Sequence, residues 1–120
     1  MHVFPQVETI ITKEVFMVKV YNKLVRDNII DIIEQDGKHA DFEILDETRY
    51  IEELEKKLAE EYKEYLEDHS LEEMCDMIEI IDAICKARGF STEQIMEKRA
   101  QKNKKNGAFK NKIFLKKVED

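Results

Sequence analysis

Residues 54–88 read LEKKLAEEYKEYLED (54–68), HS (69–70) and LEEMCDMIEIIDAICKAR (71–88). Apolar residues recur every three or four positions on both sides of the central pair, which is the spacing of one face of a helix. The stretch therefore predicts a helical hairpin whose turn lies at His69 and Ser70. Its second helix is expected to extend to Arg88.

The hairpin places four carboxylates close to its turn. In two antiparallel helices, a residue a given distance before the turn lies level with one the same distance after it. Glu64 is therefore expected opposite Glu73 or the next residue. Glu61 is expected opposite Asp76 or the next residue. The two levels lie one helical turn apart, roughly 5 Å, so the sequence predicts a cluster of acidic groups.

The second helix of the hairpin is apolar around most of its circumference. Its one continuous polar stripe consists of Glu72, Glu79 and Lys86. A helix of this kind is expected to be buried on two sides. Glu73 and Asp76 project from one of these sides, where an unpaired carboxylate is costly, so a cation is the simplest partner. Asp82 projects from the other side, as either a hydrogen-bonded core acid or a further ligand.

The same acidic residues also have purely structural explanations. A run of carboxylates on helices is often a solvated face. Ser70 and Glu73 stand at the spacing of a capping box, in which the glutamate side chain reaches back to the serine amide instead of holding a metal. The box would explain Glu73 but not Asp76, which follows one turn later.

The composition indicates one largely helical domain. The 120 residues are 39% charged and 42% hydrophobic, with one proline and three glycines, which favours helices with few turns. Residues 96–120 hold nine basic and three acidic residues, which leaves a net charge of −13 on residues 1–95 of a chain whose total is −7. An acidic centre with a basic tail suits a metal ion and an anionic substrate better than a nucleic-acid surface.

The two cysteines are expected to be free thiols. Cys75 and Cys85 lie ten positions apart on one expected helix, about 15 Å along its axis, which is too far for a disulfide. Unpaired thiols, together with the lack of a basic leader and of a long apolar run, predict a reduced, cytoplasmic protein with no membrane role.

The remaining segments predict a mainly α fold with a small β element. The expected elements are an extended stretch in an N-terminal extension of residues 1–20, a first helix from Tyr21 to Gly37, a strand at His39–Asp46, a helix from Thr48 to Asp68, a helix from the Ser91-Thr92-Glu93-Gln94 capping box to Asn106, and a strand at Lys112–Leu115. The last two strands are expected to pair with each other. Residues 21–120 would then form a single four- to five-helix, bundle-like domain with a two-stranded β element.

Two motifs carry a resemblance to a known family. Glu60-Glu61-Tyr62-Lys63-Glu64 and Glu73-Met74-Cys75-Asp76 resemble the Glu-Glu-x-x-Glu and Glu-x-x-Asp motifs of the all-α nucleotide pyrophosphohydrolases, the MazG-like and phosphoribosyl-ATP pyrophosphohydrolase-like superfamily. Asn22-Lys23-Leu24-Val25-Arg26-Asp27 and Asn106-Gly107-Ala108-Phe109 are similar to the flanks of its short single-domain branch. The eight residues between Glu64 and Glu73 are fewer than in MazG itself, whose larger base-recognition loop is therefore not expected.

The resemblance implies roles for individual residues. The magnesium ligands would be Glu61, Glu64, Glu73 and Asp76. Glu60 and Glu61 would be the catalytic residues, with Glu60 orienting the attacking water. Lys102 and Lys105 would bind the substrate's phosphates, and Mg²⁺, or Mn²⁺, would be the cofactor.

The expected function is magnesium-dependent hydrolysis of a nucleoside triphosphate or related nucleotide to the monophosphate and pyrophosphate. The resemblance leaves two possibilities open: house-cleaning of non-standard or surplus nucleoside triphosphates, or the phosphoribosyl-ATP step of histidine biosynthesis. Carboxylates that leave metal positions open suit this chemistry, since triphosphate oxygens can complete the coordination of magnesium and no covalent nucleophile is needed. The two-sided apolar helix and the resemblance both predict a homodimer or a dimer of dimers. The alternative is a non-catalytic helical scaffold, or a nucleic-acid-binding module that uses the basic C-terminal segment.

Overall fold

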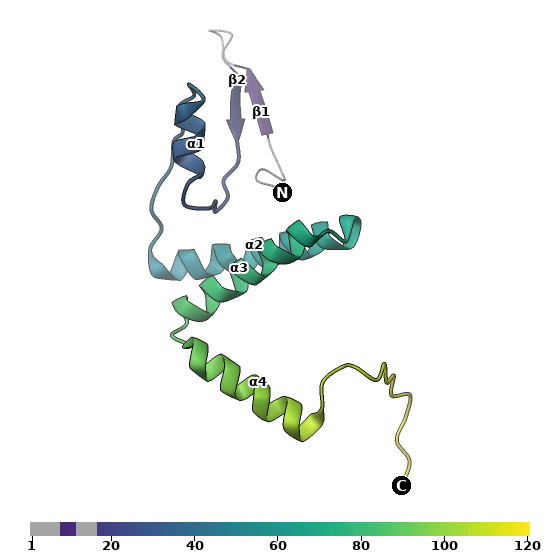
Figure 1. Ribbon diagram of the computed structural model, residues 1–120. Helices are drawn as coiled ribbons and strands as arrows, with labels where there is room; N and C mark the ends of the chain where they lie inside the picture. Colours follow the sequence, from purple (N-terminus) through teal and green to yellow (C-terminus); the bar gives the residue numbers. More distant parts are fainter. Residues whose placement is uncertain (1–7, 12–16) are drawn as a thin grey trace. The chain divides into compact units, whose positions relative to one another are not determined.

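The computed structural model describes residues 8–11 and 17–120, and this part of the chain is mainly helical (Figure 1). Its elements are β1 (Glu8–Ile11), β2 (Met17–Val20), α1 (Ile29–Gln35), α2 (Glu47–Asp68), α3 (Leu71–Ala87) and α4 (Thr92–Asn106). The chain divides into two compact units, Met1–Arg88 and Gly89–Asp120. The expectation of a mainly α protein is confirmed. No helix in the described part has the length and apolar composition that crossing a bilayer requires.

The predicted hairpin is present as α2 and α3, which pack side by side (Figure 1). Asp46 caps α2, because its Oδ1 accepts a hydrogen bond from the Arg49 amide at 2.9 Å. The turn is made by His69 in the left-handed region (φ 51°). Ser70 then caps α3, since its Oγ accepts the Glu73 amide at 3.2 Å. Both helices begin and end within one residue of the predicted bounds.

The first helix is shorter than expected. The sequence predicts a helix from Tyr21, but α1 begins only at Ile29, and Asn22 has a positive φ of 48°. Residues 22–28 are not helical because their side chains are used elsewhere: Lys23 pairs with Glu60 on α2, and Arg26 pairs with Asp76 on α3. The predicted end is correct, since α1 ends at Gln35 and Gly37 follows with φ 79°.

The small β element lies elsewhere in the chain than predicted. Neither His39–Asp46 nor Lys112–Leu115 forms a strand, and their apolar side chains are exposed, as at Ile44 (88%) and Phe114 (85%). The two described strands are β1 and β2, which pair antiparallel with Glu8 opposite Val20. Such a local hairpin closes a short loop, whereas the predicted pairing would close a loop of about 70 residues at a greater entropic cost. Residues 1–7 and 12–16 of the expected extension lie outside the described residues.

The apolar core of the first unit is small. Among the described residues, the buried apolar side chains are Ile29 on α1, Leu54 on α2 and Ile80 on α3. The side of α3 opposite these contacts is left open, with Leu71 79% and Ile78 60% exposed. Within the first unit, the described residues therefore cover only one of the two sides of α3 that the sequence predicts to be buried.

The second unit contains α4, which forms where the capping box predicts a helix. The Ser91 amide donates to Gln94 Oε1 at 2.8 Å, and the Gln94 amide donates to Ser91 Oγ at 3.1 Å. The helix ends at Asn106, and Gly107 (φ 82°) follows. None of the side chains of α4 is buried.

Candidate metal centre

Three of the four predicted ligands converge in the helical hairpin. Glu61 and Glu64 lie one turn apart on α2, and Glu73 lies in the first turn of α3. Each offers one carboxylate oxygen, and these three oxygens lie within 4.8 Å of one another. The short turn between α2 and α3 produces this convergence, because it sets the first turn of α3 level with the last turns of α2. We refer to Glu61, Glu64 and Glu73 as the carboxylate cluster.

The carboxylate cluster is more buried than acidic side chains usually are. Glu61 and Glu73 are each only 1% exposed, and they are the largest fully buried side chains in the described part of the chain. Glu61 Oε2 is buried and accepts no hydrogen bond from any described residue. Burying an ionised carboxylate without a partner is costly, so this geometry needs either a bound proton or a bound cation.

The raised pKa of Glu61 shows how strongly its surroundings disfavour the ionised carboxylate. Burial, a hydrogen bond with the Glu73 carboxylate and the charges of Glu64 and Asp76 together raise its pKa from 4.5 to about 8, while the charge of Lys57 lowers it. A group with this pKa is mainly protonated at neutral pH. Without a cation, the carboxylate cluster therefore keeps a proton that a metal ion would displace.

Asp76, the fourth predicted ligand, lies one turn after Glu73 and is 6% exposed. Its Oδ1 accepts a hydrogen bond from Arg26 Nη2 at 2.7 Å. Its Oδ2 is buried and has no hydrogen-bond partner among the described residues. Asp76 is not one of the three converging carboxylates, but its charge acts on Glu61. Asp76 thus combines a structural ion pair with one oxygen that is available to a ligand.

Glu73 uses different atoms for helix capping and for its place in the carboxylate cluster. The backbone amide of Glu73 donates to Ser70 Oγ. The Glu73 carboxylate points into the carboxylate cluster and is hydrogen-bonded to Glu61. A helix cap and a place in the cluster therefore coexist at one residue.

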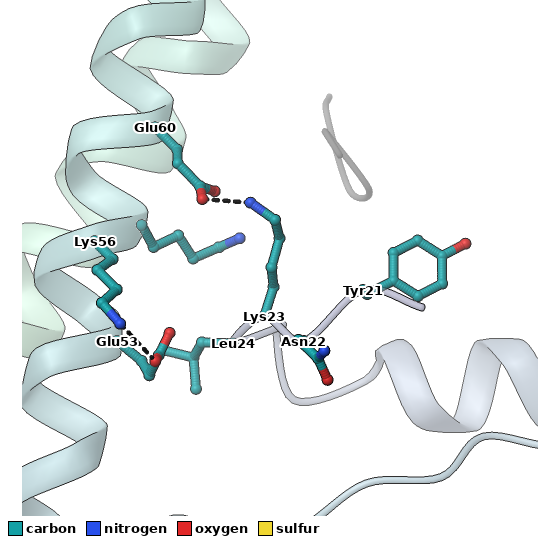
Figure 2. A pocket seen from close by; sticks show the side chains of 8 residues that line it. Tyr21, Asn22, Lys23, Leu24, Glu53, Lys56 and Glu60 are labelled. Carbon is teal, nitrogen blue, oxygen red and sulfur yellow. Dashed lines mark hydrogen bonds and ion pairs between the residues drawn. The ribbon is translucent and has the colours of Figure 1, made fainter. Parts of the chain in front are cut away.

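Glu60 faces a different direction from its neighbour Glu61. It forms an ion pair with Lys23, and Figure 2 shows these two side chains reaching toward each other. Both line a pocket of about 280 Å³ between residues 21–24 and one face of α2. The role of Glu60 in orienting water stays a prediction.

The remaining candidates lie outside the carboxylate cluster. Lys102 and Lys105 are exposed on α4 in the second unit, where they line a depression of about 310 Å³ with Lys98. Their phosphate-binding role stays a prediction. Asp82 is not a core acid, because its side chain is 45% exposed and pairs with Lys86 at 2.8 Å, four residues later on α3.

Three basic residues were not among the predicted site residues. Lys23 and Arg26 reach the acidic helices from the segment before α1, and Lys57 acts on Glu61 from one turn earlier on α2. The spacing of Lys57 and Glu61, four residues apart, could have revealed this last contact. The other two lie in Asn22–Asp27, a segment that the resemblance had singled out without giving Lys23 or Arg26 a role.

The donor set of the site suits a hard divalent cation. Carboxylate oxygens are the preferred ligands of magnesium and manganese, and softer metals favour nitrogen or sulfur. The unpartnered oxygens of Glu61 and Asp76 are the atoms that such an ion would satisfy. Comparison of the chain with protein-family models, with curated proteins and with solved structures gives no match. The residues themselves must therefore support any functional assignment.

Proposed function

We propose that the chain is a magnesium-dependent nucleotide pyrophosphohydrolase with the all-α fold of the MazG-like superfamily. The observation that carries this proposal is the convergence of Glu61, Glu64 and Glu73 around a buried, unpartnered oxygen of Glu61. A buried cluster of acidic groups is poorly suited to stabilising a fold by itself. Its geometry supports the binding of a cation.

The site suits a substrate that carries a polyphosphate, as a nucleoside triphosphate does. Three or four carboxylates can hold a magnesium ion while leaving coordination positions for the oxygens of a polyphosphate. When bound, magnesium would offset phosphate charge and lower the pKa of an attacking water. Glu61, Glu64 and Glu73 would orient the ion, with Asp76 supplying its free oxygen.

The chain's own residues would then handle the proton. A carboxylate of the site takes a proton from the water that attacks the α-phosphorus on the side opposite the bridging oxygen. The bond between the α-phosphorus and the bridging oxygen breaks, so that pyrophosphate leaves and the nucleoside monophosphate remains.

The test is pyrophosphate release from a panel of nucleoside triphosphates and related nucleotides, followed by phosphorus NMR with magnesium, with manganese and with chelator. We expect release only with a metal present. Asp76→Asn should remove most of the activity, whereas Asp82→Asn, a matched change on the same helix but outside the site, should keep it. A panel with no turnover under either metal, or equal activity in the two variants, would refute the proposal.

The second candidate is a nucleic-acid-binding module. The observation in its favour is the basic depression on α4, lined by Lys98, Lys102 and Lys105. Binding by such a surface weakens steeply as salt rises, because bound lysines release counterions from the phosphate backbone. Salt-sensitive oligonucleotide binding without pyrophosphate release would favour this candidate.

A further inference from the structure

The pocket beside the carboxylate cluster has a distinctive charge pattern. One wall is a single face of α2, where Glu53, Lys56, Lys57 and Glu60 recur at helical spacing. The other wall is the segment of residues 21–24, which contributes Lys23 (Figure 2). Three ammonium groups and two carboxylates therefore surround a space of about 280 Å³.

Two of the three lysines are already engaged. Lys23 pairs with Glu60, and Lys56 pairs with Glu53 at 3.3 Å, as Figure 2 shows. Lys57 forms no ion pair with any residue in the described part of the chain and is half-buried. The pocket thus carries one net positive charge, centred on Lys57.

The pocket adjoins the carboxylate cluster along α2. Lys57 precedes Glu61 by four residues, which is one helical turn or about 5.4 Å along the axis. The two side chains lie on neighbouring parts of the same helical face, and the Lys57 charge is felt at Glu61. A ligand that spans both places must be anionic at the lysine end and able to coordinate a metal at the other end.

We propose that this pocket binds the pyrophosphate portion of the nucleotide, with Lys57 as the contact residue and Lys23 as a second contact. This inference rests on the proposed function, because it extends the same site from the metal to the phosphate chain. A polyphosphate has several charged groups in a row, so one can meet the metal while the next meets the lysines. Lys57 can bind phosphate oxygens without breaking an existing pair, whereas Lys23 must first leave Glu60.

The inference is tested by calorimetric titration of inorganic pyrophosphate into the protein in excess magnesium. Lys57→Gln should weaken binding by at least about tenfold, which corresponds to the loss of one charge-assisted hydrogen bond. Lys57→Arg keeps the charge and should restore most of the affinity. Lys63→Gln removes one positive charge from α2 outside the pocket and should bind like the parent. Melting curves of all four proteins establish that each is folded.

The outcomes separate this inference from the proposed function. Equal pyrophosphate affinity in the parent and Lys57→Gln would overturn the pocket assignment, even if nucleotides are hydrolysed. Failure of the parent to bind pyrophosphate would overturn it as well. Binding that depends on Lys57 in a protein that hydrolyses no nucleotide would support the pocket and refute the proposed activity.

Discussion

Glu61→Gln tests whether the carboxylate cluster opposes folding when no cation is bound. In the folded chain the pKa of Glu61 is raised to about 8, above its ordinary value of 4.5, by burial first and then by its acidic neighbours. Between these two values the folded protein holds a proton that the unfolded chain has lost. The contribution of Glu61 to stability is therefore complete below about pH 4.5 and is lost as the pH rises toward 8.

The size of the stability change follows from the one proton that the folded chain holds and the unfolded chain has lost. The free energy of unfolding should fall by about 1.4 kcal/mol for each pH unit within this window, if Glu61 alone titrates. Between about pH 5.5 and about pH 7.5 the parent should therefore lose about 3 kcal/mol relative to Glu61→Gln, which has no proton to lose. Glu67→Gln, an exposed change on the same helix, should keep the parent's pH dependence.

The assay is urea unfolding of the three proteins in chelator at these two pH values. The free energies of unfolding of the parent and Glu61→Gln should be closer at the lower pH, and Glu61→Gln should become the more stable protein as the pH rises. Added magnesium should reduce the parent's loss at the higher pH, since the ion displaces the proton from the carboxylate cluster. If the parent and Glu61→Gln show the same pH dependence, the account of a proton trapped in the cluster is wrong.

Two further predictions concern the surroundings of the carboxylate cluster. Arg26→Met leaves the buried Asp76 without its cation and should destabilise the chelator-treated protein by about 1–2 kcal/mol. This loss is smaller than for a fully buried ion pair, because Arg26 is 44% exposed. Urea unfolding measures the loss, and added magnesium should recover part of it. Ile78→Glu places a charge on the exposed apolar side of α3. We expect light scattering to give a dimeric or larger mass for the parent and a smaller one for this variant, and a monomeric parent at micromolar concentration would contradict the expectation.

The local parts of the fold could be predicted from the sequence. The bounds of α2 and α3 follow from apolar periodicity, from the Ser70 cap and from the short turn, and α4 follows from its capping box. The meeting of Glu61, Glu64 and Glu73 follows from the same hairpin, because residues at equal distances from a turn lie level. These features depend only on residues close together in the chain.

The non-local parts could not be predicted in this way. Residues 22–28 have a composition that permits a helix, but they are not helical, because Lys23 and Arg26 pair with residues 37 and 50 positions away. The apolar residues of His39–Asp46 and Lys112–Leu115 indicated strands, but strand formation also needs a partner. The local pattern of apolar and charged residues indicates neither the partner of a strand nor the long-range ion pairs of Lys23 and Arg26.

Binding of a divalent metal by the carboxylate cluster can be measured by titrating Mn²⁺ into the protein and following the electron paramagnetic resonance signal of the free ion. We expect the parent to remove this signal and Glu73→Gln to weaken binding by at least about tenfold. Ser70→Ala, which removes the cap of α3 at a cost of about 1 kcal/mol but no carboxylate, should bind Mn²⁺ like the parent. Equal Mn²⁺ affinity in the parent and in Glu73→Gln would contradict metal binding by the carboxylate cluster.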